Sequence, residues 1–385
     1  MRQRDQRPIF TVGTFPPPTH GMAAVNAAVR EALRSAGAEA TVINLAASGI
    51  DRSLTNRLGR LPRVLRGLAR FACLPWRCRA TLYMSVSGGW GQVYELPFVA
   101  VARWRGMPVY LHHHSFAYLD RRSRLTGWLM RLAGPECVHI ALSTGMASRL
   151  QAQYSVKQAV AVSNTVFFLQ PDTTTEATTF APRRKLHTLG LLSNLAEEKG
   201  VFLFLDLMAA ARDAGLSLRG MLAGPFQDDE TERRVRARLT HLPAVEYVGP
   251  KYGAEKDAFF ASIDVFVFPT TYVNEAEPLV LHEAMQRGIP VIAYGRGAIP
   301  EIVGAESGLV VDPAVLFVPA ALDCLRVWLH EPAVLEAASS AAVRRCVETY
   351  SASERRWLAS RDALVDGVAM ASPSEEQSRS TSSKV

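Results

Sequence analysis

Two glutamates eight positions apart, Glu275 and Glu283, stand in the part of the chain whose residue types are best suited to chemistry. Glu275 lies in a loop after an apolar strand expected at 264–268, and Glu283 lies in a helix that opens around Leu279. Strand ends and helix starts meet at one edge of a parallel sheet, where α/β proteins bind nucleotides. Free N–H groups at a helix start favour an anion, and carboxylates accept hydrogen bonds from sugar hydroxyls. The pattern therefore predicts a nucleotide-sugar site.

This segment resembles the donor site of retaining GT-B glycosyltransferases of family 4, through Glu-x7-Glu followed by Ala-Met-x-x-Gly-x-Pro-Val. The resemblance implies that Glu275 is catalytic and contacts hydroxyls of the transferred hexose, and that Glu283 binds the ribose. It also implies that the donor lies against the intervening residues, namely Ala276, Glu277, Pro278 and Leu279. These depart from the commonest Glu-Gly-Phe-Gly version, and an acid at position 277 leaves the sugar specificity open. The alternative is that both glutamates only cap and solvate a helix.

A second candidate is the segment SNLAEEKG at 193–200, which follows the first expected strand of the second half. A lysine in such a turn can reach a phosphate as a point charge. The segment resembles the family motif Gly-Arg-Leu-x-x-x-Lys-Gly, which implies that Lys199 binds the donor diphosphate and acts in catalysis. Asn194 stands where arginine is usual, so diphosphate binding would depend more on Lys199 and on backbone amides. The alternative is a Lys-Gly pair without a function.

The N-terminal segment GTFPPPTHGMAAVN, at 13–26, predicts a strand end, a stiff proline run and a helix start. Glycine permits close approach to a ligand, and the helix start can face phosphate or sugar. The segment resembles the family loop Pro-Pro-x-x-Gly-Gly. This implies that Gly21 borders the donor and that Thr19, His20 and Met22 lie on the acceptor side, with Met22 replacing the second glycine. An ordinary proline-rich loop is the alternative.

Three histidines, His112, His113 and His114, end the fourth expected strand. Strand alternation sends His112 and His114 to one face and His113 to the other. Adjacent histidines cannot easily bind one metal ion, and no matching set of ligands accompanies them, so no metal site is expected. The resemblance implies that His114 faces the cleft and, as a neutral imidazole, bonds the sugar or the acceptor. One or two of the three histidines are expected to be structural.

Apolar, β-rich runs alternate with helical stretches along the chain, which predicts doubly wound parallel sheets. The strands are expected at 9–15, 39–45, 80–86, 108–114, 137–143 and 159–164, and then at 185–192, 217–223, 245–248, 264–268, 290–293 and 309–311. We therefore expect an α/β fold of the GT-B kind, with two Rossmann-like domains facing across a cleft. The expected parts are an acceptor-binding domain (1–170), a linker (171–182), a donor domain (183–350), a terminal helix (351–370) and a disordered tail (371–385). The resemblance implies that the terminal helix crosses back to the first domain.

Charge is distributed unevenly along the 385 residues. Residues 1–180 hold 21 Lys and Arg against 9 Asp and Glu, a net charge of +12, whereas residues 181–385 carry −5. An anionic partner of the first domain is expected. Nucleic acid is not favoured, because no recognition motif accompanies the charge. An anionic membrane surface or a lipid diphosphate acceptor explains the excess better.

The segment Arg57–Arg79 is the strongest candidate for membrane contact, because 52–79 contains no acid. Helical spacing from Pro62 is expected to place Arg63, Arg66 and Arg70 on one face, opposite a face of Leu61, Leu65, Leu68 and Ala72. Basic amphipathic helices bind anionic lipid. A helix that covers a sheet and keeps its charges in water is an equal alternative.

The expected location is the cytoplasm, with a peripheral position at the inner face of the plasma membrane. No apolar run reaches the roughly 18–20 residues that a membrane span needs, and the polar N-terminus does not resemble a signal peptide. The 5 scattered cysteines offer no metal-binding or redox spacing. No cofactor is expected, since a nucleotide diphosphate sugar would be the co-substrate.

The function expected is that of a retaining glycosyltransferase, which moves a hexose from a nucleotide diphosphate sugar to an acceptor hydroxyl. The glycan would belong to a bacterial surface polysaccharide or be lipid-linked. The family mechanism is same-face attack, in which the leaving diphosphate takes the acceptor proton. Two alternatives stay open: a GT-B sugar-nucleotide epimerase or hydrolase, and a non-catalytic protein that binds a nucleotide sugar.

Overall fold

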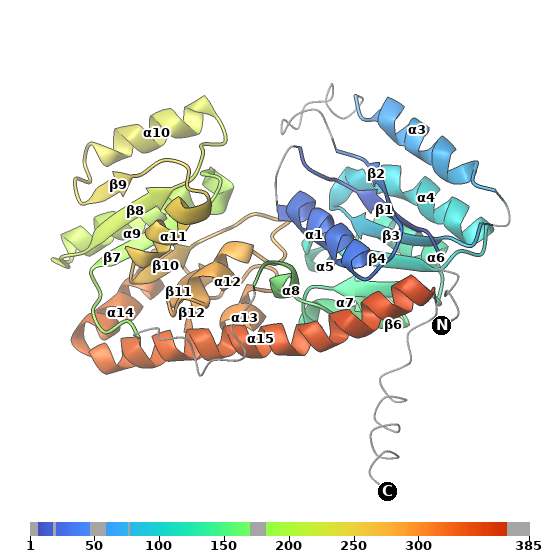
Figure 1. Ribbon diagram of the computed structural model, residues 1–385. Helices are drawn as coiled ribbons and strands as arrows, with labels where there is room; N and C mark the ends of the chain where they lie inside the picture. Colours follow the sequence, from blue (N-terminus) through green and yellow to red (C-terminus); the bar gives the residue numbers. More distant parts are fainter. Residues whose placement is uncertain (1–6, 18–20, 47–58, 76–77, 170–181, 368–385) are drawn as a thin grey trace, which may run out of the picture. The chain divides into compact units, whose positions relative to one another are not determined.

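The computed structural model describes residues 7–17, 21–46, 59–75, 78–169 and 182–367 (Figure 1). The chain divides into two compact units. One comprises Met1–Phe168 together with Ala352–Val385, and the other comprises Leu169–Ser351. Thr19, His20, nearly all of the expected linker and the expected tail lie outside the described residues.

The first unit contains a six-stranded sheet in the order β2-β1-β3-β4-β5-β6, and all of its pairs are parallel. Its strands are β1 (Ile9–Gly13), β2 (Ala40–Asn44), β3 (Thr81–Val86), β4 (Val109–His113), β5 (Val138–Ala141) and β6 (Gln158–Ala161). The chain moves outward in one direction from β1 to β2 and in the other from β3 to β6. The sheet is therefore doubly wound, as predicted.

Helices cover both faces of this sheet. They are α1 (Gly21–Ser35), α3 (Leu61–Ala72), α4 (Gln92–Trp104, after the 3-10 turn η1, Gly89–Gly91), α5 (Ala117–Asp120), α6 (Arg124–Ala133), α7 (Thr144–Tyr154) and α8 (Thr165–Phe168). On one face, Val25 and Val29 of α1 belong to a buried cluster with Trp357, near the end of the last helix. On the other face, Phe71 of α3 packs edge-on against Phe10 of β1, with ring centroids 5.2 Å apart.

The second unit contains a six-stranded parallel sheet in the order β12-β11-β10-β7-β8-β9. Its strands are β7 (Thr188–Leu192), β8 (Arg219–Ala223), β9 (Val245–Tyr247), β10 (Val265–Phe268), β11 (Val291–Tyr294) and β12 (Gly308–Val311). Its helices are η2 (Glu197–Lys199), α9 (Val201–Asp213), α10 (Asp229–Leu239), α11 (Gly253–Ala261), α12 (Leu279–Met285), α13 (Ile299–Val303) and α14 (Phe317–His330). The strand order reverses between β7 and β10, which lie side by side. Ligands of open α/β sheets bind outside the carboxyl ends of such a pair.

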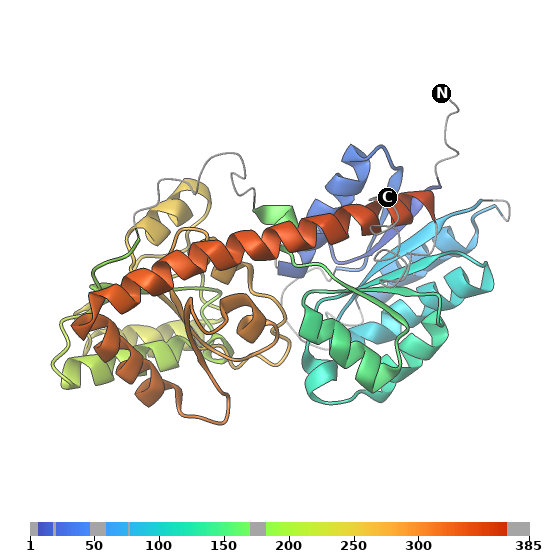
Figure 2. The same ribbon diagram turned by 90° about the horizontal axis from the view of Figure 1, so that it is seen from below.

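The last helix, α15, is longer than the terminal helix expected at 351–370. It runs unbroken over 35 residues, Pro332–Asp366 (Figure 2). The expected domain boundary at 350 therefore falls inside a helix. The part of α15 from Ala352 onward belongs to the first unit.

The apolar face predicted for α3 is not the face that the structure buries. Leu61 and Leu65 are 44% and 55% exposed, whereas Val64 and Phe71 are buried. The reason lies at Gly67, where an added Cβ would come within 2.5 Å of the Ile43 side chain of β2. The helix approaches the sheet along Val64, Gly67 and Phe71, which leaves the two leucines outside.

Among the described residues, no helix combines the length and apolar character needed to cross a membrane. Nor do three or more His, Cys, Asp or Glu side chains converge within these ranges as a metal site requires.

Candidate functional site

An ion pair joins Lys199 and Glu275 at the carboxyl ends of β7 and β10 in the second unit. Lys199 Nζ donates to Glu275 Oε2 at 2.7 Å, and Thr270 Oγ1 donates to the same oxygen at 3.0 Å. The side chain of Lys199 is 21% exposed and that of Glu275 is 8% exposed. The reversal of strand order thus brings together two predicted site residues from distant parts of the sequence.

The loop that contains Lys199 is hydrogen-bonded to the loop after β10. Thr271 N donates to Glu198 O at 2.9 Å. Gly200 follows Lys199 with φ of +86°, and a Cβ there would lie 2.4 Å from Pro269 O. Only glycine satisfies both this left-handed conformation and this close approach. The sequence Lys-Gly is therefore explained by the backbone as well as by the charge.

Aromatic rings flank the ammonium group of Lys199. The Nζ atom lies 4.4 Å from the centroid of the Tyr272 ring and 6.0 Å from that of Phe268. Ring faces attract a cation at such distances. Together with Glu275 they fix the position of the positive charge at the strand ends.

The loop from Glu275 to Pro278 is hydrogen-bonded to the loop after β11. Ala298 N donates to Ala276 O at 2.8 Å. Gly297 has φ of +57°, and a Cβ there would lie 2.5 Å from Glu275 O. Ala276 and Pro278 are buried and Leu279 is half-buried at the start of α12. The backbone of the predicted donor loop is thus well constrained.

Glu283 is paired with a residue that the sequence interpretation did not include. Lys256 Nζ of α11 lies 2.5 Å from Glu283 Oε1, and both side chains are partly exposed. Arg287 Nη1 also donates to Glu283 O at 2.7 Å. A ribose that binds Glu283 would have to share the carboxylate with Lys256.

Glu277 turns inward rather than toward solvent. Its Oε1 lies 2.9 Å from His282 Nε2, and the side chains are 1% and 2% exposed, respectively. The carboxylate therefore lies in the interior of the second unit, against the first turn of α12. Asn194, by contrast, is exposed, and no hydrogen bond of its side chain is found within the described residues.

The remaining predicted residues lie in the first unit. Gly21 is the first residue of α1, where a Cβ would meet nothing within 4 Å, and Met22 is half-buried beside it. His114 follows β4 and is half-buried, with its ring centroid 4.1 Å from that of His112. His112 and His114 share a face of the sheet, as alternation predicts.

Buried polar groups surround the other two histidines. His112 Nδ1 lies 2.6 Å from the Tyr83 hydroxyl, and His113 lies between the Tyr118 hydroxyl at 2.8 Å and His139 Nδ1 at 3.0 Å. Burial lowers the pKa of His139 to about 3. Burial, and then the neighbouring histidines, hold the pKa values of His112 and His113 well below the usual range. These rings are neutral at pH 7.

Glu95 is a buried acid in the first unit whose carboxylate lies at Ser87, directly after β3. Its Oε1 accepts hydrogen bonds from Ser87 N at 2.9 Å and Ser87 Oγ at 2.6 Å. Burial nevertheless raises the pKa of Glu95 to about 7, against the lowering effect of both bonds. Its Oε2 has no hydrogen-bond partner within the described residues.

Residues 186–326 match the family described as Glycosyl transferases group 1. The matched segment lies within the second unit. It contains Lys199, Glu275 and Glu283, so the ion pairs described above lie within the matched segment.

Two relatives and one solved structure extend the comparison. The chain is 30% identical over 158 residues to sulfoquinovosyl transferase SQD2 of Arabidopsis thaliana, a match that covers 39% of this chain and 28% of that protein. It is 28% identical over 181 residues to the colanic acid biosynthesis glycosyltransferase WcaL of Escherichia coli, covering 43% of this chain and 41% of WcaL. The chain thus spans less than half the length of these relatives. The structure of Anabaena Alr3699/HepE in complex with UDP-glucose matches with a TM-score of 0.65 at 16% identity, over 91% of this chain and 98% of that one.

The structural likeness and the two parallel sheets establish the two-domain α/β fold of the GT-B kind that the sequence predicted. Sequence interpretation missed several partners in the matched segment: Thr270, Tyr272, Lys256 and His282. Thr270 and Tyr272 could have been found, because they directly follow a predicted strand. Lys256 and His282 had no such signal, since they lie within helices.

Proposed function

We propose that this chain is a retaining glycosyltransferase, which moves a hexose from a nucleotide diphosphate sugar to an acceptor hydroxyl. The observation that carries the proposal is the Lys199–Glu275 pair at the carboxyl ends of β7 and β10, within the matched domain. One cation and one carboxylate side by side suit a ligand that joins a diphosphate to a polyhydroxyl ring. The UDP-glucose bound by the structurally similar HepE is a donor of this kind.

In the proposed mechanism Lys199 stabilises the charge that develops on the departing diphosphate. A fixed cation is effective here because it need not reorganise as the charge forms. When the diphosphate engages Lys199, the Glu275 carboxylate is released to accept hydrogen bonds from the hexose hydroxyls. The leaving phosphate oxygen takes the acceptor proton, so no strong side-chain base is needed.

Glu283 is proposed to bind the nucleotide ribose and the loop 276–279 to border the sugar and diphosphate. Glu277 is proposed to keep the backbone of this loop in position through its contact with His282. In the first unit we propose that His114 hydrogen-bonds the sugar or the acceptor as a neutral imidazole. Gly21 is proposed to border the donor and Met22 the acceptor.

The acceptor is proposed to be a lipid-linked or surface glycan, which the enzyme reaches from the cytoplasmic side of a membrane. The exposed Leu61 and Leu65 support this, because they stand on a helix whose Arg66 and Arg70 are also exposed. Apolar side chains can enter the interface while neighbouring cations attract anionic lipid.

Incubation with UDP-, GDP- and ADP-sugars tests the proposal, with and without an extract of lipid-linked acceptors. The expected result is release of nucleoside diphosphate from one donor only when acceptor is present, with an α- or β-linkage that keeps the donor configuration. Release without acceptor would indicate an epimerase or hydrolase. Donor binding without release across an acceptor panel would indicate a non-catalytic protein.

A further inference from the structure

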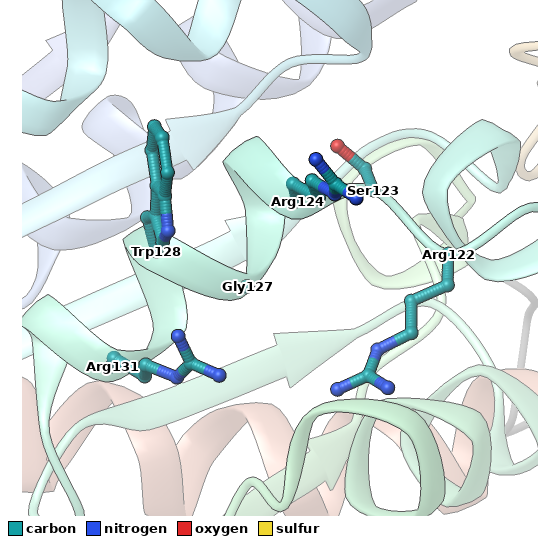
Figure 3. A pocket seen from close by; sticks show the side chains of 6 residues that line it. All are labelled: Arg122, Ser123, Arg124, Gly127, Trp128 and Arg131. Carbon is teal, nitrogen blue, oxygen red and sulfur yellow. The ribbon is translucent and has the colours of Figure 1, made fainter.

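A hollow of about 440 Å³ lies at the beginning of α6 in the first unit (Figure 3). It is lined by Arg122, Ser123, Arg124, Gly127, Trp128 and Arg131. Helical spacing puts the last four on one side of α6. Figure 3 shows Arg122 and Arg131 reaching toward the same space beside Gly127 from opposite sides.

The three arginines of this hollow, Arg122, Arg124 and Arg131, have no acidic partner within the described residues, and all three are exposed. The nearest acid in sequence, Asp120, is engaged by Arg149 at 3.2 Å. Three guanidinium groups around one hollow favour an anion of more than one charge. Planar guanidinium groups bind phosphate oxygens in pairs of hydrogen bonds.

Gly127 lines the hollow, and packing does not require a glycine there. A Cβ at this position would meet only the Tyr154 ring, at 4.0 Å, which is an ordinary contact. Glycine inside a helix costs roughly 0.5–1 kcal/mol relative to alanine. The missing side chain therefore leaves space between the arginines without a structural benefit to the helix.

Three hydrogen bonds hold the backbone around the hollow in place. Ser123 N donates to the Tyr154 hydroxyl at 2.9 Å, and Ser123 Oγ caps α6 by accepting from Thr126 N at 3.3 Å. Thr126 Oγ1 in turn donates to Gln92 Oε1, in the first turn of α4, at 2.8 Å. The hollow is therefore a preformed feature of the first unit.

An apolar side chain stands exposed at the hollow. Trp128 is 59% exposed within its lining. Elsewhere in the first unit, α4 and its leading turn also expose Trp90, Val93 and Trp104. Tryptophan is favoured where one end of a side chain is apolar and the other is wet, as at a membrane interface. A free phosphate compound would make no use of this exposed ring.

We propose that this hollow binds a phosphate group, and that the phosphate belongs to an anionic lipid headgroup. Arg122, Arg124 and Arg131 would hold the phosphate oxygens, and Trp128 would rest against the adjoining apolar part of the lipid. The site belongs to the first unit, whereas the matched segment 186–326 belongs to the second. It therefore does not depend on the proposed transfer reaction.

Vesicle cosedimentation tests the site, with phosphatidic acid in phosphatidylcholine compared with phosphatidylcholine alone. Wild-type protein is expected to prefer the anionic vesicles, and each single Arg→Ala change at the three positions should lower the partition coefficient about fivefold. Arg121→Ala is the matched control, since Arg121 is exposed next to Arg122 but does not line the hollow. Equal losses for Arg121→Ala and Arg122→Ala would overturn the site in favour of diffuse charge.

Gly127→Leu fills the hollow without removing charge. It should weaken anionic vesicle binding by tenfold or more while the melting temperature stays the same or rises, because leucine favours helix. Unchanged binding by this folded variant would contradict a built phosphate site. Calorimetry with inorganic pyrophosphate separates the two sources of phosphate: binding of pyrophosphate without preference for anionic vesicles would overturn the lipid assignment. Lys199→Ala should bind vesicles as wild type does, so failure of the transferase proposal would leave this result unaffected.

Discussion

The Nζ atom of Lys199 lies 2.7 Å from Oε2 of Glu275, although 76 positions separate the two residues in the chain. The pair means that the lysine charge is already compensated before any donor is bound. In the proposed function, a donor diphosphate competes with Glu275 for Lys199, and its binding leaves the carboxylate available for the sugar hydroxyls. Diphosphate binding and sugar binding would then be coupled through one ion pair.

Replacement of Lys199 by alanine is expected to reduce kcat by about 10²–10³-fold, which is typical of the loss of one group that stabilises developing charge. Steady-state rates of nucleoside diphosphate release measure this effect. Lys185→Ala is a suitable control, because Lys185 is exposed in the same unit and lies before β7. Similar rates for Lys199→Ala and wild type would refute the assigned role.

Glu283 should act on donor affinity rather than on turnover. Glu283→Gln removes a charged acceptor of ribose hydroxyl bonds, which are worth about 1.5–3 kcal/mol each, so the donor KM should rise at least tenfold. The value of kcat should stay within about twofold. Asp257→Asn serves as control, since Asp257 pairs with Arg287 at 2.5 Å beside Lys256 without touching the Glu283 carboxylate. A fall in kcat at constant KM would assign Glu283 to the chemical step instead.

Glu277 is expected to affect stability first, because its carboxylate is buried against His282. Glu277→Ala leaves the His282 nitrogen without its partner and should lower the free energy of unfolding by about 2–3 kcal/mol. Glu277→Gln can still accept the bond and should cost less than about 1 kcal/mol. Thermal unfolding distinguishes the two. A changed preference between two donor sugars in a stable Glu277→Ala variant would show instead that the carboxylate reaches the donor.

The fold was predictable because each strand carries its own signal. Parallel strands buried on both faces form continuous apolar runs, such as VFVF at Val265–Phe268, and short turns separate them from helices. The orientation of α3 was not predictable in this way. Its leucines have the correct spacing for a buried face, but Gly67 allows closer approach to Ile43 than any larger residue would. Such shape complementarity depends on a residue of another strand.

The charged residues of the candidate site were predictable from the sequence, whereas most of their partners were not. Glu275 and Lys199 were assigned from motifs, and their meeting follows from the adjacency of β10 and β7. The inward direction of Glu277 could not be inferred, because it requires knowing that His282 lies one turn into the next helix, on the buried side. The Lys256–Glu283 pair likewise joins two helices whose contact the sequence does not specify.

Glu95 predicts a pH dependence of stability in the first unit. Burial raises its pKa from 4.5 to about 7, so between these values the unfolded chain has lost a proton that the folded chain retains. Stability therefore falls as pH rises from about 4.5 to 7, and the loss then stays constant at higher pH. At roughly 1.4 kcal/mol per pKa unit, the full effect is on the order of 3 kcal/mol.

Glu95→Gln isolates this effect, because the glutamine oxygen can still accept both bonds from Ser87 while the side chain no longer ionises. The difference in melting temperature between variant and wild type should be small at pH 4.5, grow as pH rises and level off above pH 7, where the variant is more stable by several degrees. The buried His112, His113 and His139 contribute equally to both proteins, so their acid sensitivity cancels in this difference. A difference that does not change with pH would mean that Glu95 ionises at its ordinary pKa in the folded protein.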